Sequence, residues 1–320
     1  MGRGDTATYP FRKLWVMQHR GIMWRDIDPR ELDIRLVVCD MDGTLLDGDS
    51  QLPEGFWEVY RLLTEHNVTF VPASGRQLAT LTKMFRPTDS GATGVDDVED
   101  REEVSLPQTN DFIAENGNLV IHSGERVWQS VIPESIAQEV IHAVRTGVDV
   151  GRNLGLVMCA ADGAYVDRDD DAFLAEARKY YASLDVVPDV ADVEDDFLKF
   201  AIYDFDDAES AAGSIFGSLD ERYRPVVSGQ HWIDVMDSSV NKGVALRRLQ
   251  EALGVTREQT AVFGDYLNDR EMIAEGQYSF AMENAHPTIM EEANYWAPAN
   301  TEAGVVQVLR HLFDGSSGAH

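Results

Sequence analysis

The chain has 320 residues and a formal net charge of −29 at pH 7, because 56 Asp and Glu residues outnumber 27 Lys and Arg residues. Hydrophobic residues make up 44% of the chain and charged residues 26%, a composition typical of a folded globular protein and not of a disordered or fibrous chain. The acidic field repels polyanions, so nucleic acids and anionic membranes are poor candidates for partners. The two cysteines form no paired motif, which argues against a disulfide scaffold or a structural zinc site.

The N-terminal residues 1–32 show no helical or strand periodicity, and we predict that they form an extension. They lack the continuous apolar segment of a signal peptide, and the chain has no apolar run of the ~18 residues that a membrane span needs. We therefore expect a cytoplasmic protein with no membrane partner.

A strand, a helix and a strand are predicted next, in residues 33–39, 53–66 and 68–73. This order is typical of the βαβ unit of a parallel α/β sheet. A further helix is expected near residues 78–85 and a solvated acidic loop near residues 96–103. Residues 112–121 are predicted to form a strand that turns at Asn116-Gly117 and resumes.

Between about residues 130 and 225 the pattern changes and alternates helices with hairpins, as in an α+β layer that two further short strands complete. Helices are predicted at 133–145, 171–184 and 208–222, and strands at 154–160, 164–167, 197–205, 226–227 and 232–236. The α/β pattern then returns with helices at 242–253, 267–274, 288–293 and 301–313, and strands at 260–263 and 278–282. We assign residues 129–225 to an inserted domain, residues 33–128 and 226–313 to a discontinuous core, and residues 314–320 to a disordered tail.

Four short polar stretches follow predicted strands or begin helices, where open α/β sheets bind their ligands. They are Asp40-Met41-Asp42-Gly43-Thr44, Ser74, Lys242 and Gly264-Asp265-Tyr266-Leu267-Asn268-Asp269. Several carboxylates around one point repel each other unless a hard cation binds them, and an oxygen-only ligand set suits Mg²⁺. A serine hydroxyl and a lysine ammonium can bind the oxygens of a phosphoryl group.

These stretches, in this order, resemble the four motifs of the haloacid dehalogenase (HAD) superfamily of phosphotransferases. Ala114-Glu115-Asn116-Gly117, Asn241-Lys242-Gly243 and Ala281-Met282-Glu283-Asn284-Ala285 are similar to the Cof-type sugar phosphatases, many of which have glycine where this chain has Glu283. The resemblance covers roughly residues 33–313. It implies a Rossmann-like core with a parallel sheet and an inserted α+β cap domain between the second and third motifs.

The resemblance also implies a role for each motif residue. Asp40 would be the nucleophile that forms an aspartyl-phosphate, and Asp42 the acid and base. Mg²⁺ would be held by the Asp40 carboxylate, the Asp42 backbone carbonyl and Asp265, with Asp269 as a further ligand or a partner of the metal's waters. The phosphoryl group would be bound by Thr44, Ser74, Lys242 and Asn268. Substrate contacts are possible for Gly43, Gly75, Arg76, Glu115 and Asn116.

The sequence thus predicts a Mg²⁺-dependent phosphatase for a small phosphorylated metabolite, such as a sugar phosphate, with a cap that opens and closes. One alternative is a specialised disaccharide-phosphate or glycosylglycerate phosphatase, or a phosphotransferase, on the same scaffold. A phosphorylatable signalling domain fits less well, because it lacks the insertion and the motif at 264–269. A non-catalytic binding protein ranks last. The sequence does not predict the oligomeric state.

Overall fold

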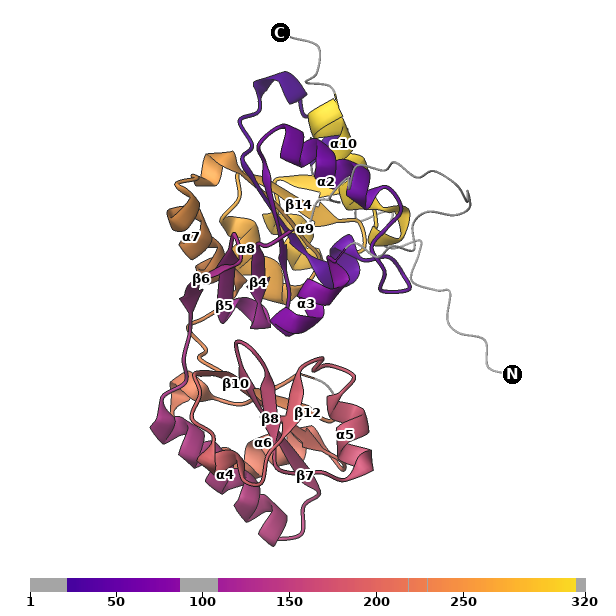
Figure 1. Cartoon of the computed structure of the whole chain (residues 1–320). Helices are drawn as coiled ribbons and strands as arrows, with labels where there is room; N and C mark the ends of the chain where they lie inside the picture. Colours follow the sequence, from indigo (N-terminus) through magenta and orange to yellow (C-terminus); the bar gives the residue numbers. More distant parts are fainter. Residues whose placement is uncertain (1–21, 87–108, 218, 229, 315–320) are drawn as a thin grey trace, which may run out of the picture. The chain divides into compact units, whose positions relative to one another are not determined.

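The computed structural model describes residues 22–86, 109–217, 219–228 and 230–314 (Figure 1). The N-terminal extension before residue 22, the acidic loop at 96–103 and the tail after residue 314 lie outside these residues. The chain divides into two compact units, Met1–Phe70 with Gly254–His320 and Val71–Leu253. In the part of the chain that is described, no helix combines the length and the apolar character that crossing a bilayer requires.

The first unit contains a parallel sheet with strand order β1-β15-β14-β13-β2, and β3 begins beside β2. All five residues of β2 and of β13 are buried, and the two strands pair in parallel with Val38 opposite Val262. Such fully buried strands are typical of sheets covered on both faces. The strands are β1 (Ile22–Met23), β2 (Leu36–Asp40), β3 (Thr69–Ala73), β13 (Thr260–Gly264), β14 (Tyr278–Met282) and β15 (Tyr295–Ala297).

The helices of the first unit place their apolar faces inward. In α10 the residues Val305, Leu309 and Leu312 are buried because they recur at helical spacing. Pro287 begins α9, where His286 Nδ1 accepts a hydrogen bond from the Thr288 backbone. The helices are α2 (Phe56–Glu65), α8 (Arg270–Ala274), α9 (Pro287–Glu292) and α10 (Gly304–Asp314), with short turns η1 (Trp24–Asp26), η2 (Pro29–Glu31), η3 (Met41–Leu45), η8 (Arg257–Gln259), η9 (Leu267–Asp269) and η10 (Asn300–Glu302).

The second unit holds the end of β3, which pairs in parallel with β4, and two further strands that are antiparallel. The expected strand that turns and resumes is confirmed: β4 (Phe112–Ala114) is followed by the turn η5 (Glu115–Gly117) and β5 (Leu119–His122). The remaining elements of this part are β6 (Glu125–Gln129), α3 (Leu78–Met84) and α7 (Lys242–Leu253).

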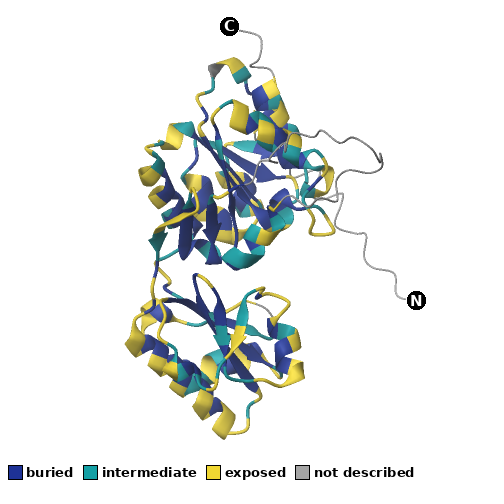
Figure 2. Ribbon diagram, in the orientation of Figure 1, coloured by how far each residue is buried: buried dark blue, intermediate teal, exposed yellow. Residues whose placement is uncertain are grey.

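A six-stranded sheet forms the rest of the second unit, in the order β11-β12-β10-β7-β8-β9. One face packs against α4 and α6 through Phe200, Ile202 and their neighbours, and a second cluster includes Ala201, Tyr203 and Phe173 of α5. Figure 2 shows the buried strands between helices with exposed outer faces. The elements are α4 (Glu134–Asp149), β7 (Leu154–Ala160), β8 (Ala164–Val166), α5 (Asp171–Ala177), β9 (Leu184–Val186), η6 (Val190–Asp192), β10 (Phe197–Asp204), α6 (Ala208–Ile215), η7 (Glu221–Tyr223), β11 (Val226–Val227) and β12 (Trp232–Val235).

Three predicted helices of this layer differ in length from their expected ranges. The helix expected over 171–184 ends at Ala177, because Leu184 starts a strand that pairs with β8. The helix expected over 208–222 ends at Ile215, and Asp220 then caps a separate short turn. The helix expected over 133–145 continues to Asp149 through Gly147, whose missing side chain leaves room for Leu154 and Ile215.

The six-stranded sheet also extends past the expected end of the inserted domain at residue 225. β11 pairs antiparallel with β12, and β12 pairs antiparallel with β10, so the sheet reaches Val235. Two short strands that follow the predicted boundary at residue 225 thus complete this sheet. The strands β1, β6, β9 and β15 were not predicted.

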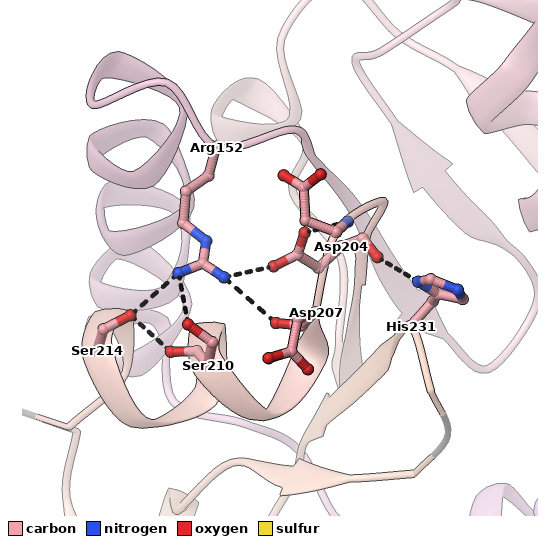
Figure 3. A network of polar contacts seen from close by, with 7 residues as sticks. Arg152, Asp204, Asp207, Ser210, Ser214 and His231 are labelled. Atoms are coloured by element: carbon pink, nitrogen blue, oxygen red, sulfur yellow. Dashed lines mark hydrogen bonds and ion pairs between the residues drawn. The ribbon is translucent and has the colours of Figure 1, made fainter.

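An arginine network joins α6 to the end of β10 (Figure 3). Arg152 Nη2 donates to Asp204 Oδ2 at 2.9 Å and to the Asp207 carbonyl, while Nη1 donates to Ser210 and Ser214 at 3.3 Å each. The Asp204 side chain has no solvent exposure. The network thus supplies a counter-charge to a carboxylate buried in the sheet.

Candidate active site

Three carboxylates of the first unit meet at the ends of two adjacent parallel strands. Asp40 is the last residue of β2, and Asp265 and Asp269 follow β13. One oxygen atom from each lies within 4.8 Å of the others, and Asp40 and Asp269 are buried. Because β2 and β13 are paired in parallel, their carboxyl ends share one edge of the sheet, which is where the sequence predicted a site.

The turn after β2 fits closely against the loop after β13. Gly43 has φ +82°, and a Cβ atom there would lie 2.4 Å from Asp265 Oδ2, so no other residue fits without displacement. Thr44 Oγ1 donates to Asp265 Oδ1 at 3.1 Å, and Asn284 Nδ2 donates to the Gly43 carbonyl at 2.7 Å. In this structure the Thr44 hydroxyl is thus bonded to the Asp265 carboxylate. Its contact with a phosphate group stays a prediction.

Asp269 holds the loop that carries Asp265. Its Oδ2 accepts hydrogen bonds from the backbone N–H groups of Asp265 and Tyr266 at 3.0 and 3.2 Å. Gly264 has no room for a side chain, since a Cβ atom would be 2.7 Å from Asp269 Cβ. The two carboxylates are therefore placed by one tight turn, which ends in η9.

Two other residues expected in this unit are exposed. Asp42 lies on η3 and Asn268 on η9, and both point to solvent-accessible surface. The Asp42 carboxylate is not one of the three that cluster among the described residues. Its predicted metal contact is the backbone carbonyl, which stays a prediction.

Asn284 is a residue whose role the sequence left open. Besides its bond to the Gly43 carbonyl, its Oδ1 accepts from the Asn300 backbone at 3.0 Å, so it ties the β2 turn to the loop after β15. The neighbouring Glu283 is exposed and is not among the positive-φ residues. The backbone at this position therefore does not require the glycine found in many relatives.

In the second unit, the predicted phosphate-binding residues Ser74 and Lys242 both lie beside the turn η5. Ser74 follows β3, and its carbonyl accepts a hydrogen bond from the Asn116 backbone at 2.9 Å. A Cβ atom on Gly117 would lie 2.5 Å from the Asn241 carbonyl oxygen, so α7, which begins at Lys242, approaches the turn closely. Both Ser74 and Lys242 are buried.

The possible substrate-contacting residues of this unit also surround η5. A Cβ atom on Gly75 would contact the Asn116 amide at 3.0 Å, and the Arg76 carbonyl accepts from the Glu115 backbone. Glu115 is 1% exposed and forms an ion pair with Lys199 of β10 at 2.6 Å. Sequence reasoning did not single out Lys199. The available signal was a lone charge within the apolar run Phe197–Ile202.

The donor set in the first unit fits a divalent metal ion. Its ligand atoms are all carboxylate oxygens, two of the three residues are buried, and mutual repulsion of their charges would be relieved by a hard cation. The described residues thus contain a cluster of three carboxylates that could hold such an ion.

Comparison with known proteins identifies the family. A family model for haloacid dehalogenase-like hydrolases matches residues 37–309. The chain is 30% identical over 281 residues to 5-amino-6-(5-phospho-D-ribitylamino)uracil phosphatase YbjI of Escherichia coli, covering 87% of this chain and 96% of the relative. It is 25% identical to the HMP-PP phosphatase of Cronobacter sakazakii, covering 81% and 87% of the two chains.

Solved structures share this fold. The crystal structure of TM0651 from Thermotoga maritima superposes with a TM-score of 0.72 at 22% identity, covering 87% of this chain and 97% of the other. The α/β core with an additional sheet is thus a fold that solved proteins share. The chain belongs to the haloacid dehalogenase-like hydrolase family, as one of its Cof-type phosphatases.

Proposed function

We propose that this enzyme is a Mg²⁺-dependent phosphomonoesterase that acts on a sugar phosphate or sugar-alcohol phosphate through an aspartyl-phosphate. The observation that carries the proposal is the cluster of Asp40, Asp265 and Asp269 at the edge of the parallel sheet. The relative from Escherichia coli supports the substrate class, because its name specifies a phosphorylated ribityl chain. The three carboxylates and the Asp42 carbonyl would hold the metal ion, whose charge offsets the negative charge on the phosphoryl oxygens.

Asp40 is the proposed nucleophile. Its carboxylate oxygen attacks phosphorus, a P–O bond forms to Asp40, and the P–O bond to the leaving group breaks. Asp42 donates a proton to the departing oxygen, so the leaving group departs as an alcohol. Because Asp42 is exposed while Asp40 is buried, the two carboxyl groups occupy different environments although they are only two residues apart.

Hydrolysis of the aspartyl-phosphate returns the enzyme to its starting state. Asp42, now deprotonated, accepts a proton from water as the water oxygen attacks phosphorus, and the bond to Asp40 breaks. Inorganic phosphate leaves. Ser74 and Lys242 are proposed to bind the phosphoryl oxygens through a hydroxyl and an ammonium group. Their support is the motif order and their common position beside η5.

Phosphate release from a panel of sugar phosphates, sugar-alcohol phosphates, nucleotides and phenyl phosphate tests the proposal. Each substrate is assayed with Mg²⁺ and with EDTA, and Asp40→Asn is the blank. We expect metal-dependent release that disappears in Asp40→Asn. Release that persists in EDTA or in Asp40→Asn, or no release from any substrate by a folded enzyme, would overturn the proposal.

A further inference from the structure

A buried ion pair joins the six-stranded sheet to the turn η5. Lys199 Nζ of β10 lies 2.6 Å from Glu115 Oε2, and the two side chains are only 7% and 1% exposed. Isolated charges are rarely buried to this extent, because removing each from water costs several kcal/mol. Because these two charges are buried, they do not contribute to solubility as surface charges do, and another role must account for them.

The local backbone directs both side chains to this place. The pairing of β10 with β7 shifts register between Phe197 and Lys199, and such bulges change the direction of a side chain. On the other side, Glu115 and Asn116 have positive φ values of 50° and 55°. Two adjacent non-glycine residues in this region are unfavourable by roughly 1 to 3 kcal/mol each, a cost that proteins usually accept at functional sites.

The pair is surrounded by hydrogen-bond acceptors that lack donors. In the described residues, Glu115 Oε1 and the side-chain oxygens of Asn116 and Asn118 are buried without a hydrogen-bond partner, while Glu115 Oε2 has the Lys199 ammonium at 2.6 Å. Buried acceptors of this kind are uncommon in folded proteins, so a missing ligand with donor groups is the natural partner.

The charged form of Lys199 persists in this setting. Burial opposes the charge and is the largest single influence, but Glu115 together with Tyr181, Asp234 and Cys159 outweighs it, so the pKa of Lys199 lies well above its usual value. The ammonium also lies 5.6 Å from the centre of the Tyr181 ring. Lys199 therefore offers N–H donors beside the unfilled acceptors of Glu115 and Asn116.

We propose that Lys199, Glu115 and Asn116 form the subsite for the leaving group, and that this subsite selects neutral hydroxylated groups over groups with a second negative charge. The inference rests on the proposed function, since Asn116 is bonded to Ser74, a proposed phosphate-binding residue. A hydroxyl group both donates and accepts, so it matches acceptors and an ammonium together. A carboxylate or second phosphate matches Lys199 alone and is repelled by Glu115.

Two substrates that share a carbon skeleton test this selection. Sorbitol 6-phosphate and 6-phosphogluconate differ at the end remote from the phosphate, where one has a hydroxymethyl group and the other a carboxylate. We expect the wild-type kcat/KM to favour sorbitol 6-phosphate at least about 10-fold, and Glu115→Gln to lower this preference about 10-fold, because the repelling charge is gone. Lys199→Met should lower kcat/KM for sorbitol 6-phosphate at least about 10-fold more than for phenyl phosphate, which has no hydroxyl groups.

Lys179→Met is the matched control, because Lys179 lies in the same unit of the chain and forms an exposed ion pair with Glu176 at 2.7 Å. It should leave both ratios unchanged. Since Lys199→Met leaves a buried carboxylate unpaired, the double variant Lys199→Met/Glu115→Gln is measured too, and it should show no preference between the two substrates. Circular dichroism confirms that each variant is folded.

Ratios that stay at the wild-type value in Glu115→Gln and in the double variant would overturn the subsite. So would a wild-type enzyme that prefers 6-phosphogluconate. Either result would leave the proposed function intact if phenyl phosphate is hydrolysed with Mg²⁺ and not by Asp40→Asn. Absence of metal-dependent release from every substrate would overturn the proposed function itself.

Discussion

Thr44 Oγ1 donates a hydrogen bond to Asp265 Oδ1 at 3.1 Å, linking the turn after β2 to the loop after β13. The Thr44 side chain is fully buried, so this bond is shielded from water. A donor that orients a metal-binding carboxylate raises metal affinity, and loss of such a donor typically costs 10- to 100-fold in affinity or activity.

We therefore predict that Thr44→Val weakens Mg²⁺ binding about 10-fold, while Thr44→Ser, which keeps the hydroxyl, binds nearly as well as wild type. Isothermal titration calorimetry with Mg²⁺ measures the affinity directly. If Thr44 acts on the phosphate instead, as its motif position suggests, Thr44→Val will raise the KM for substrate and leave Mg²⁺ affinity unchanged.

Asp40 and Asp42 have separable roles in the proposed mechanism. Asp40→Asn should reduce turnover to background, because an amide is a poor nucleophile. Asp42→Asn should slow both steps by roughly 100-fold or more, because acid and base catalysis typically contributes about that much. Rapid-quench kinetics with ³²P-labelled substrate checks this, because the aspartyl-phosphate leaves ³²P attached to the protein. We expect no labelled protein in Asp40→Asn. We expect a detectable amount in Asp42→Asn when hydrolysis is slowed more than attack. Labelled Asp40→Asn would show that another residue is the nucleophile.

The parallel sheet and its motifs were predictable from local patterns. The apolar strands β2, β13 and β14 end directly before polar motifs, and the carboxyl ends of parallel strands share one edge. The association of Asp40 with Asp265 and Asp269 follows from that rule. The positions of Gly43 and Gly264 were also informative, since both are required by close approach of a carboxylate.

Features that depend on pairing between distant segments were not predictable. The helix predicted over residues 171–184 included Leu184, but Leu184–Val186 pairs with β8 and forms a strand. The short strands β1 and β15 carry too few residues for a period to be recognised. Lys199 was missed because its importance depends on Glu115, a residue 84 positions earlier (199 − 115), and no local pattern reveals that contact.

The arginine network of the six-stranded sheet should be important for stability. Arg152→Met removes the counter-charge of Asp204, whose side chain is inaccessible to solvent, and leaves Ser210 and Ser214 without their donor. Removal of one member of a buried pair typically costs about 3 kcal/mol or more. We expect urea unfolding monitored by circular dichroism to show a loss of about 3 kcal/mol.

Arg224→Met is the control for this prediction. Arg224 pairs with Glu221 at 3.0 Å, but both side chains are exposed, at 69% and 86%. Exposed pairs contribute about 0 to 1 kcal/mol, so this variant should unfold close to wild type. Equal losses in both variants would show that burial of Asp204 does not determine the stability of the network.

The ion pair between Arg222 and Asp237 should make stability depend on acid pH. Burial of Asp237 favours its neutral form, but hydrogen bonds from Arg222 and Ser239 outweigh burial and hold the pKa of this carboxyl below its usual value of 3.8. Arg222 Nη2 lies 2.6 Å from Asp237 Oδ2, and Ser239 Oγ donates to Oδ1 at 2.6 Å. Since the folded state holds the proton more weakly than the unfolded state, the bonds stabilise the fold fully above about pH 4.

We predict that Asp237→Asn lowers the free energy of unfolding at pH 7 by about 1 to 2 kcal/mol, the usual range for a hydrogen bond to a charged group. As pH falls below about 4, the wild-type carboxylate must be protonated and the difference between the two proteins should shrink. Thermal unfolding of both proteins between pH 7 and pH 3 measures this, with the exposed Asp169→Asn as a control for the loss of one charge. A difference that stays constant over this range would show that the Asp237 charge does not stabilise the fold, because protonation of this carboxylate would then cost no stability.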